Sequence, residues 1–276
     1  HFTYYQIEVD GWMREYWVYV PDSAKNSENA VPLVLSIHGS GGTGWEMITR
    51  TDWHKVADRS DFIVAYPTGL YNADSTGAGT GWNTGAATDV RVDDSAFIRA
   101  MIAKIEEDYA IDASRIYACG HSAGTGMATG LAVRCSDLFA AIATSAPVAR
   151  GGRDIYDGLA ALAEQVYEMG VMFSLGTLDE YCIDNEGQAD VDGLTSRTYM
   201  DYWQKMYGFE SDSYGYYENG NFKNYVFCKA DGTPVYQWTK VIGKLHAPLP
   251  EEEMLFYEFM SKYSRGENGE LLYMGK

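Results

Sequence analysis

The chain has 276 residues, of which 46% are hydrophobic, and 39 acidic side chains against 21 basic ones give it a formal net charge of -18. Binding to a nucleic acid requires clustered Lys and Arg, so the charge argues against a nucleic-acid partner and favours a substrate that is neutral near its reacting group. No apolar run is long enough to cross a membrane, and we expect no membrane partner.

The chain shows no internal repeat, linker or break in composition, and its length suits one α/β domain over residues 1–276. It begins at His1 rather than Met and has no signal-like segment, which fits the mature form of a secreted protein as well as a cloned fragment. Four cysteines without C-x-x-C spacing leave two alternatives open, a bridge between Cys182 and Cys228 or free thiols.

The N-terminal part of the chain carries strand signals with one helix between them. Residues 2–9 and 15–20 are rich in β-branched and aromatic residues and predict a hairpin. The nearly continuous apolar run at 31–37 predicts a central strand that is covered on both faces. A helix at 46–58 and a short buried strand at 62–66 follow.

A long stretch at 70–90 is rich in Gly, Thr and Asn, and long loops in compact domains often border functional sites. Trp82 lies within it and is a candidate for binding a substrate through its ring. A helix is predicted at 93–109, with Asp93 as its N-cap. Asp93 and Asp94 could also form an acid–base pair, but a cap followed by a first-turn charge is the favoured interpretation.

A possible nucleophile lies near the middle of the chain. Residues 115–119 form an apolar, strand-like run that leads into the G-x-S-x-G sequence at 120–124, and a helix of small residues is predicted at 123–134. This is the pattern of a nucleophile elbow, a sharp strand-to-helix turn that lifts a serine hydroxyl clear of a sheet. Ser122 is therefore the candidate nucleophile.

The rest of the chain continues to alternate, with strands predicted at 140–144, 171–175, 225–228 and 235–242 and helices at 159–169, 196–207 and 251–262. Repeated strand–helix–strand order implies parallel pairing, because each crossover must carry a helix over the sheet. The predicted fold class is therefore α/β, with a mostly parallel central sheet, helices on both faces and an N-terminal antiparallel hairpin. A polar tail is expected after the last helix.

A serine nucleophile requires a base, and the base requires an orienting carboxylate. Among five histidines, only His246 follows both the elbow and a later strand, as the residue order of α/β-hydrolases requires. Asp179 follows the strand at 171–175 by a short glycine turn, at the edge of the sheet where sites lie. It is the candidate acid, and Asp184 is the substitute if that strand ends later than predicted.

The oxyanion formed during acyl transfer requires two preorganised donors. The backbone N–H of Ala123 is one candidate, because it lies at a helix N-terminus. The glycine loop at 38–42, after the central strand, supplies the other, with the N–H of Ser40 preferred and that of Gly41 second. The acidic residues at 181–193 lack the spacing of a calcium loop, so a solvated loop is favoured there, and we expect no metal.

Seven segments resemble esterases of carbohydrate esterase family one and the polyhydroxybutyrate depolymerase group, within the α/β-hydrolase superfamily. They are YWVYVP (16–21), PLVLSIHGSGG (32–42), YPTG (66–69), GWN (81–83), VDDSAFIRAMI (92–102), IDASRIYACGHSAG (111–124) and GTLDEY (176–181). Beyond Asp179 the resemblance rests mainly on His246. Two features depart from it: Leu245, Ala247 and Pro248 surround the histidine where many members have a glycine-rich segment with tryptophan, and Ser40 stands where relatives often have cysteine.

The resemblance implies a secreted, cofactor-free feruloyl or acetyl xylan esterase in which Ser122 attacks and Asp179 and His246 complete a triad. Ser40 and Ala123 would supply the oxyanion donors. The substrate would be a polysaccharide-linked or small phenolic or acyl ester, and attachment to a larger modular enzyme is compatible with this. Three alternatives stay open: a polyhydroxyalkanoate depolymerase-like esterase, a serine peptidase of the same fold, and a noncatalytic glycan-binding relative.

Overall fold

The computed structural model describes residues 2–25, 27, 29–70, 81–83, 92–147, 155–161, 163–181 and 194–276. Its strands are β1 (Phe2–Val9), β2 (Trp12–Tyr19), β3 (Val31–Ile37), β4 (Ile63–Pro67), β5 (Ile111–His121), β6 (Ala141–Ser145), β7 (Gly170–Gly176), β8 (Gly215–Asn219), β9 (Phe222–Cys228), β10 (Pro234–Val241), β11 (Tyr263–Arg265) and β12 (Leu271–Tyr273). Its helices are α1 (Asp22–Lys25), α2 (Gly44–Arg50), α3 (Trp53–Ser60), α4 (Asp94–Asp108), α5 (Ala123–Arg134), α6 (Ile155–Ala160), α7 (Leu194–Tyr207) and α8 (Pro250–Met260).

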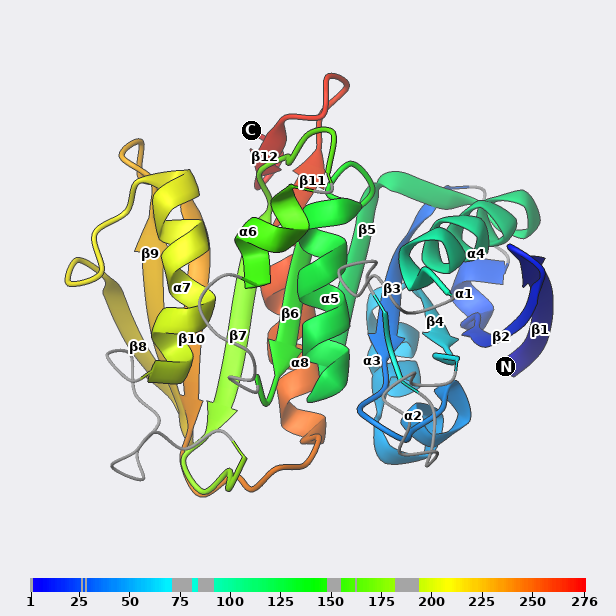
Figure 1. The fold of residues 1–276 in the computed structure, drawn as a ribbon, viewed down its shortest axis with the longest axis horizontal. Coiled ribbons are helices and arrows are strands. Elements are labelled where there is room, and N and C mark those ends of the chain that lie inside the picture. The colour runs from blue at the N-terminus through cyan, green and yellow to red at the C-terminus, as the bar shows by residue number, and fades with distance from the viewer. Residues whose placement is uncertain are drawn as a thin grey trace.

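Ten of these strands form one sheet in the order β1-β2-β4-β3-β5-β6-β7-β10-β9-β8 (Figure 1). The strands from β4 to β10 in this order pair in parallel. Antiparallel hairpins, β1-β2 and β8-β9, form the two ends of the sheet. The prediction of a mostly parallel α/β sheet with an N-terminal antiparallel hairpin is confirmed. Because the central strands run in one direction, their carboxyl ends meet at one edge, where such sheets place their sites.

Helices cover both faces of the sheet, which explains the unbroken apolar strands in the sequence. All residues of β3, β4, β6 and β7 are buried. One core lies between the sheet and helices α4 to α7 and includes Phe97 and Trp203. The other lies between the opposite face and helices α2, α3 and α8 and includes Met47 and Phe256. In Figure 1 the first set of helices lies on the viewer's side of the sheet.

Helix α4 begins as predicted, since the Asp93 carboxylate accepts a hydrogen bond from Ser95 N–H at 2.9 Å. Its neighbour Asp94 lies in the first turn of the helix, as expected. It is buried and forms an ion pair with the equally buried Arg14 of β2, with 2.5 Å between Nη2 and Oδ1. Two charges that are taken out of water require such a partner, so the pair ties the N-terminal hairpin to α4.

The single helix predicted at 46–58 is wrong, because the chain forms two helices, α2 and α3. The backbone is extended at Thr51, whose hydroxyl donates to Met47 O at 2.5 Å and closes α2. The next amide, Asp52 N–H, donates to the carboxyl oxygen Oε2 of Glu253 in α8 at 2.7 Å. A backbone donor that is used by a distant side chain is not available to a continuous helix.

The helix predicted at 159–169 is also wrong, since α6 ends at Ala160. Distant side chains bind the backbone that follows. The Ser136 hydroxyl accepts from Tyr167 N–H at 2.9 Å and donates to Gln165 O at 3.3 Å. Tertiary hydrogen bonds outweigh helix propensity here.

The predicted polar tail is wrong, because β11 and β12 form a small antiparallel hairpin after α8. Its residue Tyr263 is buried, and Arg265 donates to the carbonyl oxygens of Ser136 and Phe139. Cys119 is a buried free thiol, and Cys228 is exposed. A bridge, one of the two alternatives left open for Cys228, would involve Cys182, which lies outside the described residues.

Candidate active site

Ser122 lies in the tight turn between β5 and α5, at the carboxyl edge of the sheet. Its backbone has φ 56° and ψ -115°, a left-handed geometry that a non-glycine residue adopts at a cost. The flanking glycines are required by space: a Cβ on Gly120 would lie 2.3 Å from Gly124 O, and one on Gly124 would lie 2.3 Å from Ile37 O. This is the geometry expected of a nucleophile elbow, with the hydroxyl presented at a helix N-terminus.

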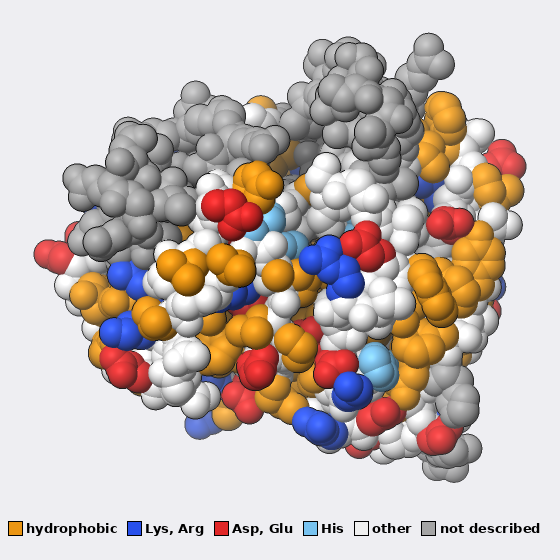
Figure 2. All heavy atoms as spheres, turned by 90° about the horizontal axis from the view of Figure 1, so that it is seen from below, with side chains coloured by type: hydrophobic (Ala, Val, Ile, Leu, Met, Phe, Trp, Pro, Cys, Tyr) orange, Lys and Arg blue, Asp and Glu red, His pale blue; other side chains and the backbone are white. Residues whose placement is uncertain are grey.

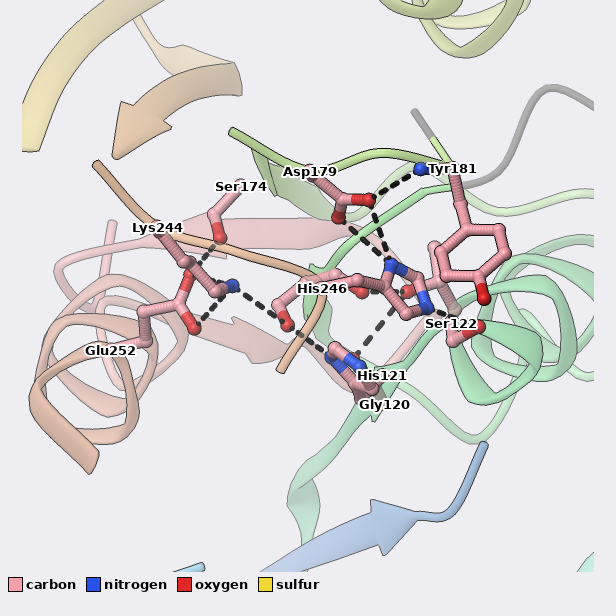
Figure 3. Close-up of polar contacts among 11 residues, drawn as sticks. Gly120, His121, Ser122, Ser174, Asp179, Tyr181, Lys244, His246 and Glu252 are labelled. Carbon is pink, nitrogen blue, oxygen red and sulfur yellow. Dashed lines mark hydrogen bonds and ion pairs between the residues drawn. The ribbon is translucent and has the colours of Figure 1, made fainter. Parts of the chain in front are cut away.

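His246 lies beside the serine, in the segment between β10 and α8. Its Nε2 is 2.9 Å from Ser122 Oγ, and its Nδ1 is 2.9 Å from each carboxylate oxygen of Asp179 (Figure 3). The structure therefore brings the three predicted residues together in one chain of hydrogen bonds. A carboxylate only accepts, so Nδ1 carries the imidazole proton, and Nε2 is free to accept the serine proton.

Asp179 is held by the turn that follows β7. Its side chain is fully buried, and Oδ1 also accepts from Tyr181 N–H at 3.0 Å. The turn itself lies against the segment that carries the histidine, because Leu178 N–H donates to Lys244 O at 3.0 Å. The acid and the base thus come from two neighbouring strand ends that are bonded to each other. Asp184, the alternative acid, lies outside the described residues, as does the acidic stretch at 182–193.

The glycine loop after β3 lies against the elbow. A Cβ placed on Gly39 would be 3.5 Å from Ser122 Cβ, so this loop borders the nucleophile. His38 supports it: its Nδ1 donates to Gly39 O at 2.6 Å, and its Nε2 accepts from Gly69 N–H at 2.8 Å. Burial lowers the pKa of His38 to about 4, which keeps this ring neutral. The donor roles of Ser40 and Ala123 remain predictions.

Trp82, the predicted substrate-binding residue, packs on the glycine loop. Its indole N–H donates to His38 O at 2.8 Å, and its ring lies 4.5 Å from the His38 ring, centroid to centroid. Trp82 is partly buried in the described segment 81–83. The ring therefore supports the loop, and its contact with a substrate stays a prediction. Most of the stretch at 70–90 lies outside the described residues.

Exposed apolar side chains border the histidine. Leu178, Tyr181 and Leu245 are 56%, 57% and 59% exposed, and the Tyr181 ring lies 4.7 Å from the His246 ring in an edge-on contact. Figure 2 views this end of the molecule, where histidine side chains are visible next to hydrophobic ones. An apolar rim next to Asp179 and His246 suits a substrate with an apolar acyl or alcohol group.

A buried polar network behind the elbow was not foreseen from the sequence. Lys244 pairs with Glu252 of α8 and donates to Ser145 Oγ at 3.3 Å, and Ser145 Oγ lies 2.9 Å from His121 Nδ1. Burial, then the nearby Lys244, lowers the pKa of His121 to about 3, so this ring is neutral. Lys and Glu side chains are seldom fully buried, so the sequence does not suggest that these two would be. Only the structure shows that Lys244 and Glu252 meet in the interior.

The described ranges contain no group of three or more metal-binding His, Cys, Asp or Glu side chains. Within the same ranges, no helix is long and apolar enough to span a lipid bilayer.

Residues 14–164 match the protein family described as esterase PHB depolymerase. A bifunctional acetylxylan esterase/xylanase from Neocallimastix patriciarum is 26% identical over 252 residues, which is 91% of this chain and 33% of that protein. Feruloyl esterase B from Piromyces equi is 28% identical over 214 residues, which is 75% of this chain and 38% of that protein. The chain thus spans about a third to two fifths of the length of the curated relatives it matches.

Solved structures share the fold. An acetyl xylan esterase from Aspergillus awamori has a TM-score of 0.66 and 18% identity, with 94% of this chain and 99% of that chain covered. A ferulic acid esterase from Anaeromyces mucronatus has a TM-score of 0.60 and 16% identity, with 100% of this chain and 90% of that chain covered. The predicted α/β-hydrolase fold is confirmed by these likenesses.

Proposed function

The chain belongs to the PHB depolymerase esterase family, and on that premise we propose that it is a serine esterase that hydrolyses feruloyl or acetyl esters of plant xylan. The observation that carries the proposal is the hydrogen-bonded series Asp179, His246 and Ser122 at one edge of the sheet. A member of an ester hydrolase family with this series has the groups that acyl transfer requires.

In the proposed reaction, His246 Nε2 takes the proton of Ser122 as Oγ attacks the ester carbonyl carbon. The oxyanion that forms accepts hydrogen bonds from the N–H groups of Ala123 and Ser40. The C–O bond then breaks, His246 returns the proton to the leaving alcohol, and the acyl group stays on Ser122. Water then attacks the acyl carbon with the same imidazole as base, the bond from this carbon to Ser122 Oγ breaks, Oγ takes the proton back from His246, and the carboxylic acid is released. Asp179 stays ionised and stabilises the imidazolium.

The substrate class is supported by the matched relatives, whose names describe esterases of feruloyl and acetylxylan esters. The chemistry of the surface agrees with it. An exposed apolar rim at Leu178, Tyr181 and Leu245 suits a phenolic or acyl group, and the net charge of -18 is no obstacle to a neutral polysaccharide. We further propose that Trp82 contacts the substrate with the exposed part of its ring. A secreted enzyme is proposed because xylan is extracellular.

The test compares wild type and Ser122→Ala on methyl ferulate, acetylated xylan and p-nitrophenyl acetate. We expect Ser122→Ala to lose at least about 10³-fold in kcat on all three, because the nucleophile is removed. Ser114→Ala, a change at the other end of β5, should keep wild-type rates. Wild-type rates for Ser122→Ala would contradict the esterase mechanism.

The family name favours one second candidate, an esterase that acts on a hydroxybutyrate polyester. The same triad would cleave it, so only the substrate distinguishes the two. Release of hydroxybutyrate from polyester film, at a rate above ferulate release from xylan, would replace the xylan assignment. A serine peptidase of the same fold would instead cleave aminoacyl anilides, which we expect to stay intact while esters are turned over.

A further inference from the structure

Lys244 and Glu252 form a buried ion pair, and the role proposed for it rests on the proposed esterase function. Lys244 Nζ lies 2.7 Å from Glu252 Oε2 and 2.8 Å from Oε1, and the side chains are only 4% and 2% exposed. Ser174 of β7 donates to the same carboxylate. Removing two charges from water is costly, and a buried pair often stabilises no better than apolar side chains of similar volume. The pair therefore calls for an explanation beyond stability.

The side chain of Lys244 reaches the elbow. Its ammonium donates to Ser145 Oγ, which can then donate its own proton to His121 Nδ1, the residue before Ser122 (Figure 3). The direction is fixed by charge, because an ammonium has no lone pair to accept with. Ser145 also holds the elbow through its carbonyl oxygen, which accepts from Ser122 N–H at 3.1 Å and from the Thr125 hydroxyl at 2.6 Å.

The backbone of Lys244 holds the acid. Its carbonyl oxygen accepts from Leu178 N–H in the turn before Asp179. The fit is close: a Cβ on Gly176 would lie 2.2 Å from Lys244 O, which only glycine permits. Two neighbouring bonds fasten the same turn, from Thr177 N–H to Val241 O at 3.0 Å and from Gly243 N–H to the Thr177 hydroxyl at 2.9 Å.

Lys244 thus contacts the segments that carry Ser122 and Asp179, and His246 follows it by two residues. We propose that the Lys244–Glu252 pair is a positioning element that fixes the segment bearing His246 relative to the elbow and to the acid turn. Glu252 contributes by fixing the ammonium from α8. A displacement of about 1 Å in a catalytic side chain can cost on the order of 10²-fold in rate. A gain of this size explains why an ion pair that is costly to bury lies here.

The experiment separates positioning from stability. Lys244→Met with Glu252→Gln removes both charges, leaves no unpaired ion in the interior, and keeps an acceptor for Ser174. We expect its melting temperature to stay near that of wild type, while kcat on p-nitrophenyl acetate falls about 10- to 100-fold and KM changes less than about twofold. The rate of labelling by a fluorophosphonate should fall by a similar factor, since it depends on the same serine and histidine.

The control is Lys229→Met with Glu168→Gln, which removes a partly exposed ion pair, 2.6 Å long, at the amino ends of the central strands. It should leave kcat and labelling unchanged. A Lys244/Glu252 double variant that is as active as wild type would overturn the proposal and leave a purely structural pair.

Ser145→Ala provides a second measurement that does not depend on the double variant folding. It keeps the ion pair and cuts its link to His121. We expect kcat to fall about fivefold or more at unchanged KM, and wild-type kcat would overturn the proposal. Ser122→Ala tells the two hypotheses apart: if it abolishes ester hydrolysis while the Lys244/Glu252 and Ser145 variants stay fully active, the esterase function stands and only the positioning role fails.

Discussion

The Asp179 carboxylate accepts from His246 Nδ1 with both oxygens and lies wholly out of water. An Asn at this position would present an N–H to the imidazole and favour the tautomer with the proton on Nε2, which cannot accept from Ser122. We expect Asp179→Asn to lower kcat on p-nitrophenyl acetate by about 10³- to 10⁴-fold without loss of folded protein.

The control for this prediction is Asp137→Asn, at an exposed acid that pairs with Arg99 on the surface. It should leave kcat unchanged. Asp184→Asn tests the alternative acid directly. An Asp179→Asn variant with nearly wild-type kcat, together with an inactive Asp184→Asn variant, would reassign the acid to position 184.

The three residues of the triad could be predicted from the sequence, because their order along the chain and their positions after strands can be read from it directly. Ser122, Asp179 and His246 were each expected after a strand of the sheet, and the structure brings them together at its carboxyl edge. The supporting residues Lys244 and Glu252 could not be predicted in the same way. Their burial depends on how β10 and α8 pack, which no short pattern in the sequence records.

The elbow as an element depends on close backbone packing between α5 and β3. A Cβ on Gly124 would lie 2.3 Å from Ile37 O and 2.8 Å from His38 O, both backbone atoms that cannot move aside easily. We expect Gly124→Ala to lower the free energy of unfolding in urea by about 1–3 kcal/mol and to reduce kcat as well, because the helix and Ser122 are pushed from the sheet.

Gly126→Ala is a matched control in the same helix. Nothing lies within 4 Å of a Cβ at this position, so Ala should raise the free energy of unfolding by about 0.5–1 kcal/mol through better helix propensity. Equal effects of the two substitutions would show that the close approach of Gly124 is not what holds the elbow.

The pairing of β2 with α4 depends on Arg14 and Asp94. Arg14→Met keeps the contact of the side chain with the Phe97 ring, which lies 4.0 Å from the guanidinium, and leaves the Asp94 carboxylate buried without its cation. We expect a loss of about 3–5 kcal/mol in the free energy of unfolding, measured in urea. Arg99→Met, which breaks an exposed ion pair with Asp137, should cost less than about 1 kcal/mol.

Helices and strands were predicted well where apolar runs are long, and poorly where hydrogen bonds from distant side chains determine where an element ends. The strand at 31–37 and the helix at 123–134 match β3 and α5. An unbroken apolar run, or a run of small residues, predicts its element without knowledge of tertiary contacts. The helix expected at 159–169 fails because Ser136, far away in the sequence, binds its backbone. Strand β8 was missed, because its residues are all exposed and show no burial pattern.

The stability of the whole molecule should depend on pH through buried groups that stay neutral. Burial raises the pKa of Glu253 from 4.5 to about 8, so the folded state retains a proton that the unfolded state loses above pH 4.5. Stability from this group is therefore complete below pH 4.5 and is lost as pH rises through 8. Burial lowers the pKa of His38 and His121 from 6.5 to about 4 and about 3, and stability from these rings is lost as pH falls below 6.5.

Among Glu253, His38 and His121, only Glu253 changes its contribution to stability between pH 6.5 and pH 8. We expect the free energy of unfolding to fall by at most about 1.4 kcal/mol per pH unit in this window. Glu253→Gln, which cannot ionise, should flatten the fall, and the exposed Glu251→Gln should retain it. Denaturation in urea across the window measures both, and an unchanged slope in Glu253→Gln would rule out Glu253 as its source.

The C-terminal hairpin β11-β12 has a practical consequence. It packs at the amino ends of the central strands, where Tyr263 lies against Gly170 and Arg265 binds the carbonyl oxygens before β6, and Lys276 follows it closely (Figure 1). The elbow and its partners lie at the opposite end of those strands. A bead or electrode coupled at Lys276 alone would therefore hold the molecules in one orientation, with the nucleophile on the side that faces away from the support.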